Sequence, residues 1–387
     1  MKVLKSIFFV LLNLLDYASP KAKRKYVFTS FPDFSDNAFS LYLYVLNNHP
    51  EIKNIWLIDD ISKTDLYLKT LQNYINHPPA VRFVKKNSLK GFYHFLTARY
   101  VFFTHGIYKG MRFSPRHIVV NLWHGMPIKK IGYLDPKSPV RPIRSKYVTV
   151  TAGIYQKIFE KAFRMPISNI LISGQVRNDL LFEYPVNALQ KLGIDPQNEI
   201  IIWMPTYRKS IVGDIRTDGL SDKKLPLFKI EELPELNKKL KALKKFLIIK
   251  LHPMDYLNLV DFPEFSHIRF LKNEDFEAKG IQLYSLLAQT DVLLTDYSSV
   301  YIDYMLTGKP IGFVMEDWQS FKEKRGFVFY NPEQYLPGKI IDNPKDFIDF
   351  IQNPVKHPDY EHINTLLNEV RRNFANETLS QLKNPDA

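Results

Sequence analysis

The sequence predicts an α/β protein built from two consecutive parallel sheets. Short apolar runs that suit buried strands alternate with helical stretches from residue 26 onwards. The chain has 387 residues, more than one hydrophobic core usually supports, so two domains are expected. Its central stretch, residues 291–313, reads as a complete strand–helix–strand unit in which residues 295–299 follow the first strand.

The first series of elements is expected before residue 185. Apolar runs predict strands at 26–31, 55–58, 81–84, 100–106, 118–125, 147–150 and 170–174, and helical spacing predicts helices at 40–46, 89–97 and 155–163. Two of these strands end in His-Gly, which places His105 and His124 at carboxyl ends of strands. Ligands of open parallel sheets bind at that edge.

A second series begins near residue 200. Strands are expected at 200–205, 246–251, 292–294, 311–314 and 339–341, with a Lys-rich helix at 236–243 and closing helices between 344 and 382. A boundary between 180 and 198 and a cleft between the two sheets follow. We therefore divide the chain into residues 1–25, a first α/β domain at 26–185, a second α/β domain at 186–345 and closing helices at 346–387.

Residues 1–25 form a separate amphipathic segment. Apolar residues fall at helical spacing, and a basic cluster follows: Leu4, Ile7, Phe8, Leu11, Leu12 and Leu15, then Lys21, Lys23, Arg24 and Lys25. The apolar run is much shorter than the roughly 20 residues of a membrane span, and no small-residue cleavage site follows it. The segment is expected either to lie on an anionic membrane surface or to pack on the protein's own core.

Composition narrows the classes of function. The sequence contains no Cys, which excludes a disulfide framework, thiolate catalysis and Cys-based metal sites. Its formal charge of +13 suits nucleic acid, an anionic membrane or a phosphorylated substrate. The basic residues are dispersed and no nucleic-acid-binding signature occurs, so nucleic acid is the least favoured partner.

The candidate functional residues gather at predicted strand ends. A single His there is more often structural, but several such His with two Arg and a Ser-Ser helix start favour a functional site. The segment 295–299 combines hydroxyls with a helix start, which suits a phosphate. The sequence has no P-loop, no G-x-S-x-G elbow and no dense carboxylate cluster for Mg²⁺. These features fit transfer from a diphosphate-activated donor with neither metal nor cofactor.

Six separated segments carry a resemblance to a known family. Residues 121–132 resemble the W-H-G-x-P-x-K motif of the CDP-glycerol glycerophosphotransferase family, the teichoic-acid primases and polymerases. Residues 173–179 resemble its G-x-x-R-N-D segment, and 204–208, 250–253, 291–303 and 325–326 resemble its remaining motifs in the family's order. The match spans roughly residues 100 to 345.

This resemblance implies the GT-B architecture, two Rossmann-like domains facing across a cleft. It implies transfer of glycerol phosphate from CDP-glycerol to a membrane-linked acceptor, a lipid-linked saccharide or polyol-phosphate primer, with release of CMP. Such an enzyme would work peripherally at the cytoplasmic face of the cell membrane, in teichoic-acid or capsule synthesis.

The resemblance also implies roles for single residues. His124 would be the general base, and His252 the second catalytic residue, at the donor diphosphate. Substrate contacts are expected from Thr206, Arg208, Ser298, Ser299, Arg325, Lys130 and Arg177, with Asp296 making a loop or hydroxyl contact. Arg177 would lie at the hinge, where a structural role is equally expected.

Three alternatives stay open at this stage. The donor could be CDP-ribitol rather than CDP-glycerol. A GT-B glycosyltransferase that uses a sugar nucleotide would share the strand order and the diphosphate site. Outside enzymes, a basic module that binds polyanions would also fit the charge.

Overall fold

The structure, a computed structural model, describes residues 2–76, 81–108, 110–136, 143–206, 225–251 and 264–382, without the side chains of 2–7, 320, 324 and 325. The chain forms two compact units. Unit 1 comprises Met1–Met126, Pro136–Val186 and Asn368–Ala387, and unit 2 comprises Pro127–Asp135 and Asn187–Leu367. Each unit is an α/β structure around its own parallel sheet, as predicted.

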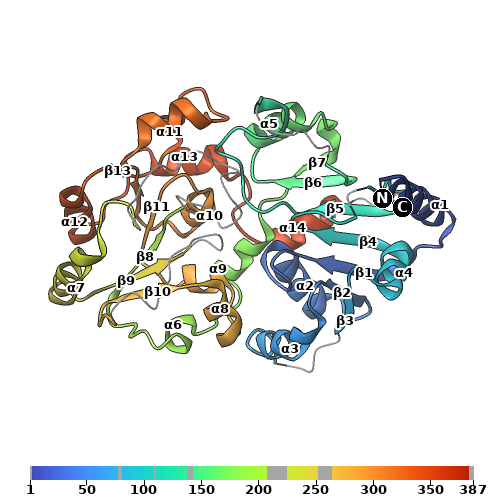
Figure 1. The fold of residues 1–387 in the computed structure, drawn as a ribbon, viewed down its shortest axis with the longest axis horizontal. Coiled ribbons are helices and arrows are strands. Elements are labelled where there is room, and N and C mark those ends of the chain that lie inside the picture. Colours follow the sequence, from blue (N-terminus) through green and yellow to red (C-terminus); the bar gives the residue numbers. More distant parts are fainter. Residues whose placement is uncertain are drawn as a thin grey trace. The chain divides into compact units, whose positions relative to one another are not determined.

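Unit 1 is built on a sheet of seven parallel strands in the order β3-β2-β1-β4-β5-β6-β7 (Figure 1). The strands are β1 (Ala22–Thr29), β2 (Lys53–Ile58), β3 (Val81–Lys85), β4 (Ala98–Phe103), β5 (Ile118–Asn121), β6 (Tyr147–Val150) and β7 (Ile170–Ile172). Central strands such as β5 are buried along their whole length, which explains their continuous apolar sequences. The strand order reverses between β1 and β4, and such a switch point is where doubly wound sheets bind ligands.

The helices of unit 1 follow the expected alternation with strands. They are α1 (Lys2–Ala18), α2 (Asp36–Asn48), α3 (Thr64–Gln72), α4 (Leu89–Thr97), α5 (Gly153–Phe163) and α14 (Phe374–Gln381), with the 3₁₀ segments η1 (Ile61–Lys63), η3 (Ile167–Asn169) and η4 (Val176–Leu181). Figure 1 shows α14 beside α2, although the two helices stand at opposite ends of the sequence.

Unit 2 repeats the topology with six parallel strands in the order β10-β9-β8-β11-β12-β13. These are β8 (Glu199–Met204), β9 (Lys245–Lys250), β10 (Ile268–Leu271), β11 (Val292–Thr295), β12 (Ile311–Val314) and β13 (Lys339–Ile341). The switch point lies between β8 and β11, so the central strand–helix–strand stretch of the sequence stands at the ligand-binding position of this sheet.

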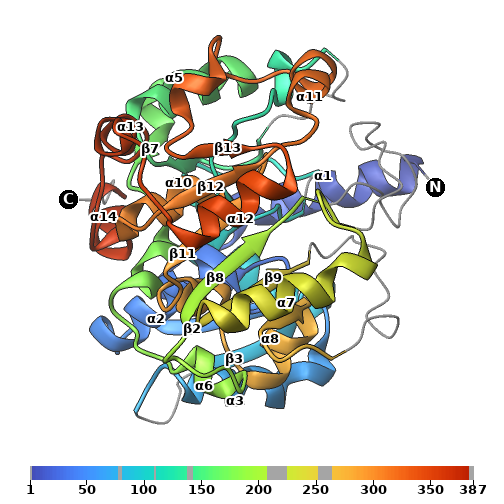
Figure 2. The ribbon, with the colours of Figure 1, turned by 90° about the vertical axis from the view of Figure 1, so that its left-hand side faces the viewer.

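The helices of unit 2 are mostly short. They are α6 (Ala188–Lys191), α7 (Leu233–Ala242), α8 (Asn273–Lys279), α9 (Leu283–Leu287), α10 (Val300–Tyr304), α11 (Trp318–Arg325), α12 (Pro344–Gln352) and α13 (Tyr360–Leu367), with η2 (Gly132–Leu134), η5 (Ile230–Glu232), η7 (Met305–Thr307) and η8 (Pro332–Tyr335). Figure 2 shows α7 and α12 in front of the sheet. Leucines of α7 and phenylalanines of α12 share one core with the apolar residues of β8, β9 and β11.

Helix α1 packs on unit 1 through one face. Leu12 is 5% exposed and belongs to the core formed with β1, β2 and β4. One turn later, Asp16 is fully buried and its Oδ1 lies 2.7 Å from Lys21 Nζ and 2.7 Å from His117 Nδ1. Through these contacts one face of the predicted amphipathic segment packs on unit 1. Among the described residues, no helix has both the length and the apolarity that crossing a membrane requires.

Two segments join units that their place in the sequence does not indicate. Residues 127–135 pair with 326–328 of unit 2: Val328 N donates to Ile128 O at 3.0 Å. The last helix, α14, belongs to unit 1, because the Asp179 carboxylate accepts from the backbone amides of Phe374 and Ala375, each at 2.9 Å. Both pairings join residues far apart in sequence, which local patterns do not reveal.

Candidate active site

The residues predicted to act in unit 1 gather on the loop that follows β5. The expected strand 118–125 is shorter than predicted, because the chain leaves the sheet after Asn121. Trp123 adopts a left-handed backbone (φ 59°) and Gly125 has φ 133°. An L side chain rarely adopts either conformation, and φ 133° strongly favours glycine. The Trp-His-Gly sequence therefore produces a tight turn with His124 at its tip.

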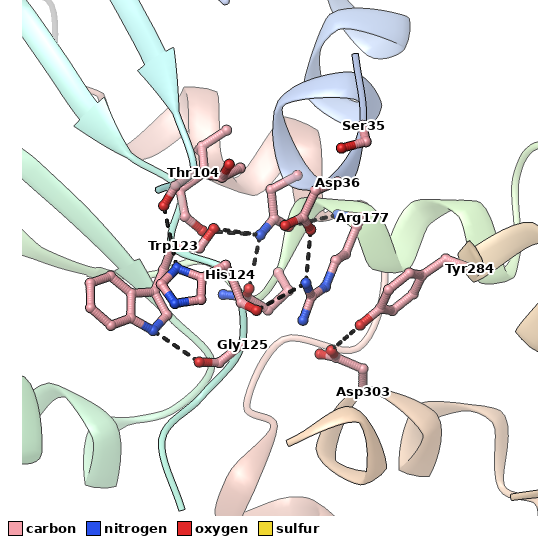
Figure 3. Close-up of polar contacts among 12 residues, drawn as sticks. Ser35, Asp36, Thr104, Trp123, His124, Gly125, Arg177, Tyr284 and Asp303 are labelled. Carbon is pink, nitrogen blue, oxygen red and sulfur yellow. Dashed lines mark hydrogen bonds and ion pairs between the residues drawn. The ribbon is translucent and has the colours of Figure 1, made fainter. Parts of the chain in front are cut away.

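Side chains hold this turn in place by its carbonyl oxygens. Leu122 O accepts from Asn37 Nδ2 at 3.1 Å and from Thr149 Oγ1 at 2.9 Å, and Trp123 O accepts from Asn37 Nδ2 at 3.1 Å. The carbonyl oxygens of the next two residues accept from the side chains of Arg177 and Trp123, at 3.1 and 2.9 Å. Four consecutive carbonyls are thus bound by side chains, and Figure 3 shows the contacts that Arg177 and Trp123 make with the last two of them.

His124 lies in a row of aromatic rings. Its ring stacks on His105 at a centroid distance of 4.2 Å and on Trp123 at 4.7 Å. Phe31, which is 65% exposed, meets the His105 ring edge-on at 5.7 Å. His124 itself is exposed to solvent. An apolar platform with an accessible imidazole therefore lies beside the switch point of unit 1.

The tautomer and charge of His124 follow from its neighbours. Its Nδ1 lies 3.4 Å from Thr104 O, and a carbonyl oxygen only accepts, so Nδ1 carries the proton. The pKa of His124 lies below its ordinary value, first because the surrounding groups desolvate the ring and then because of His105. Arg177 also lowers this pKa, whereas the Asp36 carboxylate raises it. The ring is neutral at pH 7, and Nε2 presents a lone pair.

In unit 2 the loops after β8 and β11 are joined at the switch point. Thr206 donates to Asp296 Oδ2 through both its backbone amide and its hydroxyl, each at 2.9 Å. Asp296 is fully buried, so its carboxylate shapes the loop. Ser298 and Ser299 follow it and are half-buried. The helix that starts there, α10, has five residues and continues as η7 to Thr307 before Gly308.

Two predicted motifs that are far apart in sequence meet in unit 2. Lys130 lies beside the Arg325-Gly326 segment, which follows it by 195 positions. Lys130 N donates to Gly326 O at 3.3 Å, and the Lys130 side chain lies 3.2 Å from the space that a Gly326 Cβ would occupy. Gly326 has φ 69°, so both conformation and space favour glycine there. Arg325 ends α11, and its side chain lies outside the described part of the structure.

The remaining predicted site residues divide between the described and the undescribed parts of the chain. Arg177 is 7% exposed and its Nη1 donates to Asp36 Oδ1 at 2.8 Å, so it lies beneath the His124 turn. His252 and Arg208 fall outside the described residues. Among the described residues, no cluster of three or more His, Asp or Glu side chains could hold a metal ion.

Sequence reasoning missed the contribution of the loop after β1. Asp36 and Asn37, which start α2, both contact residues around His124, and neither belongs to the motifs described above. Their position was still detectable in principle: they follow the predicted strand 26–31, the central strand of a doubly wound order, and precede a predicted helix. Phe31, in the same loop, carried no signal beyond its apolar side chain.

Two doubly wound sheets, each with polar groups at its switch point, define a GT-B-like fold. The sequence comparison then gives the family: residues 11–376 match the family described as CDP-glycerol:poly(glycerophosphate) glycerophosphotransferase, and the chain belongs to it. The enzyme class predicted from the sequence is thereby confirmed.

Similar proteins agree with this assignment. The chain is 25% identical over 391 residues to a teichoic acid poly(glycerol phosphate) polymerase of Bacillus spizizenii, covering 94% of this chain and 91% of that protein. It is 27% identical over 277 residues to a teichoic acid poly(ribitol-phosphate) polymerase of the same organism, covering 67% and 42%. The solved wall teichoic acid polymerase TagF superposes with a TM-score of 0.76 at 21% identity, covering 97% of this chain and 92% of that one. This superposition confirms the predicted fold class.

Proposed function

We propose that this chain transfers glycerol phosphate from CDP-glycerol to a hydroxyl group at the end of a membrane-linked acceptor. The acceptor oxygen bonds to the phosphorus that carries the glycerol, the bond from that phosphorus to the oxygen of the CMP phosphate breaks, and CMP leaves. The observation that supports this proposal most strongly is the accessible, neutral His124 on a turn whose four consecutive carbonyls are bound by side chains.

His124 acts as the general base in this scheme. Nδ1 is committed to Thr104 O, so Nε2 takes the proton of the acceptor hydroxyl as the oxygen attacks. A base whose pKa lies below 7 is unprotonated at neutral pH and can therefore accept a proton. The exposed ring of Phe31 offers an apolar surface on which the carbon skeleton of the acceptor could rest.

Unit 2 holds the donor. The hydroxyls of Ser298 and Ser299 bind the diphosphate, with Thr206 placed by Asp296 at the neighbouring strand end. Lys130 and Arg325 supply positive charge that offsets the donor phosphates. His252 and Arg208 complete the set by the family resemblance. Charge stabilisation and in-line placement supply most of the rate in phosphoryl transfer, so these groups act on both donor binding and CMP departure.

Removing His124 tests the proposal. His124→Ala is expected to lower the single-turnover rate with CDP-glycerol about 10²–10⁴-fold, because a general base acts only on proton transfer. CDP-glycerol affinity, measured by calorimetry, should stay within about twofold. His49→Ala, at a half-buried histidine just after α2, is the matched control and should retain full rate. A His124→Ala enzyme with an undiminished rate contradicts the role of base.

The choice of alditol needs a direct competition. Similarity to both glycerol and ribitol polymerases leaves CDP-ribitol as the second candidate donor. CMP release is measured from CDP-glycerol and CDP-ribitol, with a lipid-linked disaccharide and with a pre-primed chain as acceptors. We expect CDP-glycerol to give the higher kcat/KM. Preference for the disaccharide indicates a primase, and preference for the primed chain a polymerase. UDP release from a UDP-sugar would instead indicate a glycosyltransferase.

We also propose that the enzyme works peripherally on the cytoplasmic face of the membrane. The solvent-facing side of α1 carries large apolar residues, among them Leu11, Leu14 and Tyr17, which are 54, 63 and 54% exposed. Basic residues that are exposed or half-buried stand at or just before the amino-terminal ends of four strands of the sheet: Arg82 at β3, Lys53 at β2, Arg116 at β5 and Lys146 at β6. Apolar side chains beside a basic edge suit an anionic bilayer.

A further inference from the structure

The start of α2 lies directly behind the proposed base. Ser35 and Asp36 follow β1 at the switch point, and Asp36 has a left-handed backbone with φ 62°. Asp and Asn tolerate this conformation better than most residues. The Asp36 side chain points at Arg177 in Figure 3, and its Oδ1 accepts from Arg177 Nη1 at 2.8 Å.

Arg177 connects this carboxylate to the turn. The same nitrogen that donates to Asp36 also donates to the carbonyl oxygen of His124 at 3.1 Å. The Arg177 side chain is 8% exposed and that of Asp36 15%. A planar guanidinium held by a carboxylate on one side has a fixed direction, so it can hold a backbone carbonyl on the other.

Asn37 reinforces the same arrangement from the next position. Its Nδ2 donates to two carbonyls of the turn and to Gln175 Oε1 at 2.9 Å, while its Oδ1 accepts from Arg177 N at 2.9 Å. Both the backbone and the side chain of Arg177 are therefore held by the first two residues of α2.

We propose that Asp36, acting through Arg177, is a positioning residue that fixes His124 for proton transfer. This inference rests on the proposed function, in which His124 is the base. Asp36 does not touch the reacting atoms: it orients the guanidinium, the guanidinium holds the His124 carbonyl, and the strained turn then keeps the imidazole in one place. The pair acts as a unit, so loss of either partner removes the same restraint.

The charge of Asp36 also acts on the imidazole. The charged groups that act on His124 are Asp36, Arg177 and, when protonated, His105. The Asp36 carboxylate raises the pKa of His124, whereas Arg177 and His105 lower it. Removing the carboxylate should therefore make His124 both less well placed and less basic. A side chain with only a packing role would leave that pKa unchanged.

Asp36→Asn is the sharpest test, because it keeps the shape and the tolerance of positive φ and removes only the charge. We expect the single-turnover rate to fall about 10–100-fold, the scale of a small misplacement of a catalytic group. CDP-glycerol affinity should stay within about twofold, and NMR titration should show a lower pKa for His124. Asp33→Asn makes the same change in the same loop, where Asp33 accepts from the amides of Asp59 and Asp60, and should retain full rate.

Two further variants keep the test decisive. Arg177→Lys retains the charge but lacks the planar fork, and should lose rate like Asp36→Asn even if the latter fails to fold. Combining Asp36→Asn with Arg177→Lys should cost no more than the worse single change, because groups that act in series are non-additive. Additive losses would overturn the proposal.

His124→Ala separates this inference from the proposed function. If His124→Ala retains its rate, the role of His124 as base fails. If His124→Ala is inactive while Asp36→Asn and Arg177→Lys behave like Asp33→Asn, the base stands and the positioning role of Asp36 is wrong. A normal rate in Asp36→Asn together with a shifted pKa of His124 also overturns the positioning role. In that case the substitution changed the charge near His124 without changing the orientation of its imidazole.

Discussion

At the scale of single residues, the unit 1 site depends on backbone conformations that most residues avoid. Trp123 and Asp36 both adopt left-handed φ values, and Gly125 adopts one that strongly favours glycine. Such conformations cost about 1–3 kcal/mol each and persist where surrounding contacts impose them. Here the Trp123 indole, Asn37 and Arg177 impose them through the carbonyls of the turn.

Gly125→Ala tests how far the turn controls the base. A Cβ at φ 133° strains the backbone, so the turn should rearrange and displace His124. We expect the free energy of unfolding to fall by about 1–3 kcal/mol in urea titration and the single-turnover rate to fall more than about tenfold. Gly153→Ala, at the first position of α5, is the control for the rate: Gly153 has no positive φ, and an added Cβ would come within 3.3 Å only of Glu369 Oε1, so the single-turnover rate should stay unchanged. An active Gly125→Ala enzyme would contradict a fixed turn.

The two serines of unit 2 make a separate prediction. Replacing Ser298 and Ser299 together with Ala should weaken CDP-glycerol binding, because each hydrogen bond to a charged phosphate contributes about 1.5–3 kcal/mol. Calorimetry measures the change. Thr307→Ala removes a hydroxyl at the far end of the same helical segment, where it donates to Tyr304 O at 2.7 Å, and should leave affinity unchanged. Equal affinities in all three folded proteins would place the diphosphate elsewhere.

At the scale of elements, α14 closes unit 1 across almost the whole length of the sequence. Asp179 in η4 binds the first two amides of α14, and Thr378 Oγ1 donates to Ser173 Oγ at 3.0 Å. Gly174, with φ 75°, leaves room for the Phe374 ring, which lies 2.4 Å from the space that a Cβ would occupy. The segment 173–179 therefore attaches the last helix as well as holding the His124 turn.

The burial of Asp179 makes this attachment sensitive to pH. Burial, and after it the nearby Glu183, raises the pKa of Asp179 to about 7. The backbone amides of Phe374 and Ala375 act in the opposite direction and lower this pKa. A raised folded-state pKa means that the protonated form is favoured on folding, so this stabilisation is full below about pH 4 and lost as pH rises through 7. We expect the wild-type Tm to fall relative to that of Asp179→Asn between pH 5 and pH 8. Parallel curves would show that Asp179 does not titrate in this range.

At the scale of the whole molecule, the excess of 13 positive charges is spread over the chain, but the first sheet carries a row of them along its amino-terminal edge. His124 and the other candidate residues of unit 1 follow the carboxyl ends of the same strands. Membrane attachment and chemistry would therefore use opposite edges of one sheet, and variants that affect one should spare the other.

Two sets of substitutions test this separation. Replacing exposed Leu11, Leu14 and Leu15 with Ser should weaken sedimentation with anionic vesicles, and so should reversing Lys53 and Arg82 to Glu. Turnover of a water-soluble acceptor should persist in both. Binding should also weaken steeply with salt, because exposed charges are screened beyond about 8 Å at physiological ionic strength.

Leu12→Ala is the control for the opposite face of α1. Leu12 is buried in the core, so the substitution should lower stability by about 2–5 kcal/mol and leave vesicle binding by the folded protein intact. Vesicle binding that is unaffected by the exposed substitutions but lost in Leu12→Ala would contradict a membrane role for the outer face.

The sequence by itself determined the α/β class, most strands of both sheets and the family. These follow from local signals, because a strand buried on both faces must be continuously apolar, and a motif keeps its spacing whatever surrounds it. It also selected His124, whose neighbours Trp123 and Gly125 stand beside it in the chain.

Only the tertiary structure decided what holds His124. Asp36, Asn37 and Arg177 come from two segments about 140 positions apart, and a parallel sheet brings their strand ends together without any local sign. The same holds for Lys130 beside Gly326 and for Asp179 beneath α14. The physical reason is that these side chains bind backbone carbonyls and amides, which nearly every residue carries. The sequence therefore shows which side chain can form a hydrogen bond, but it does not show which backbone group that side chain will bind.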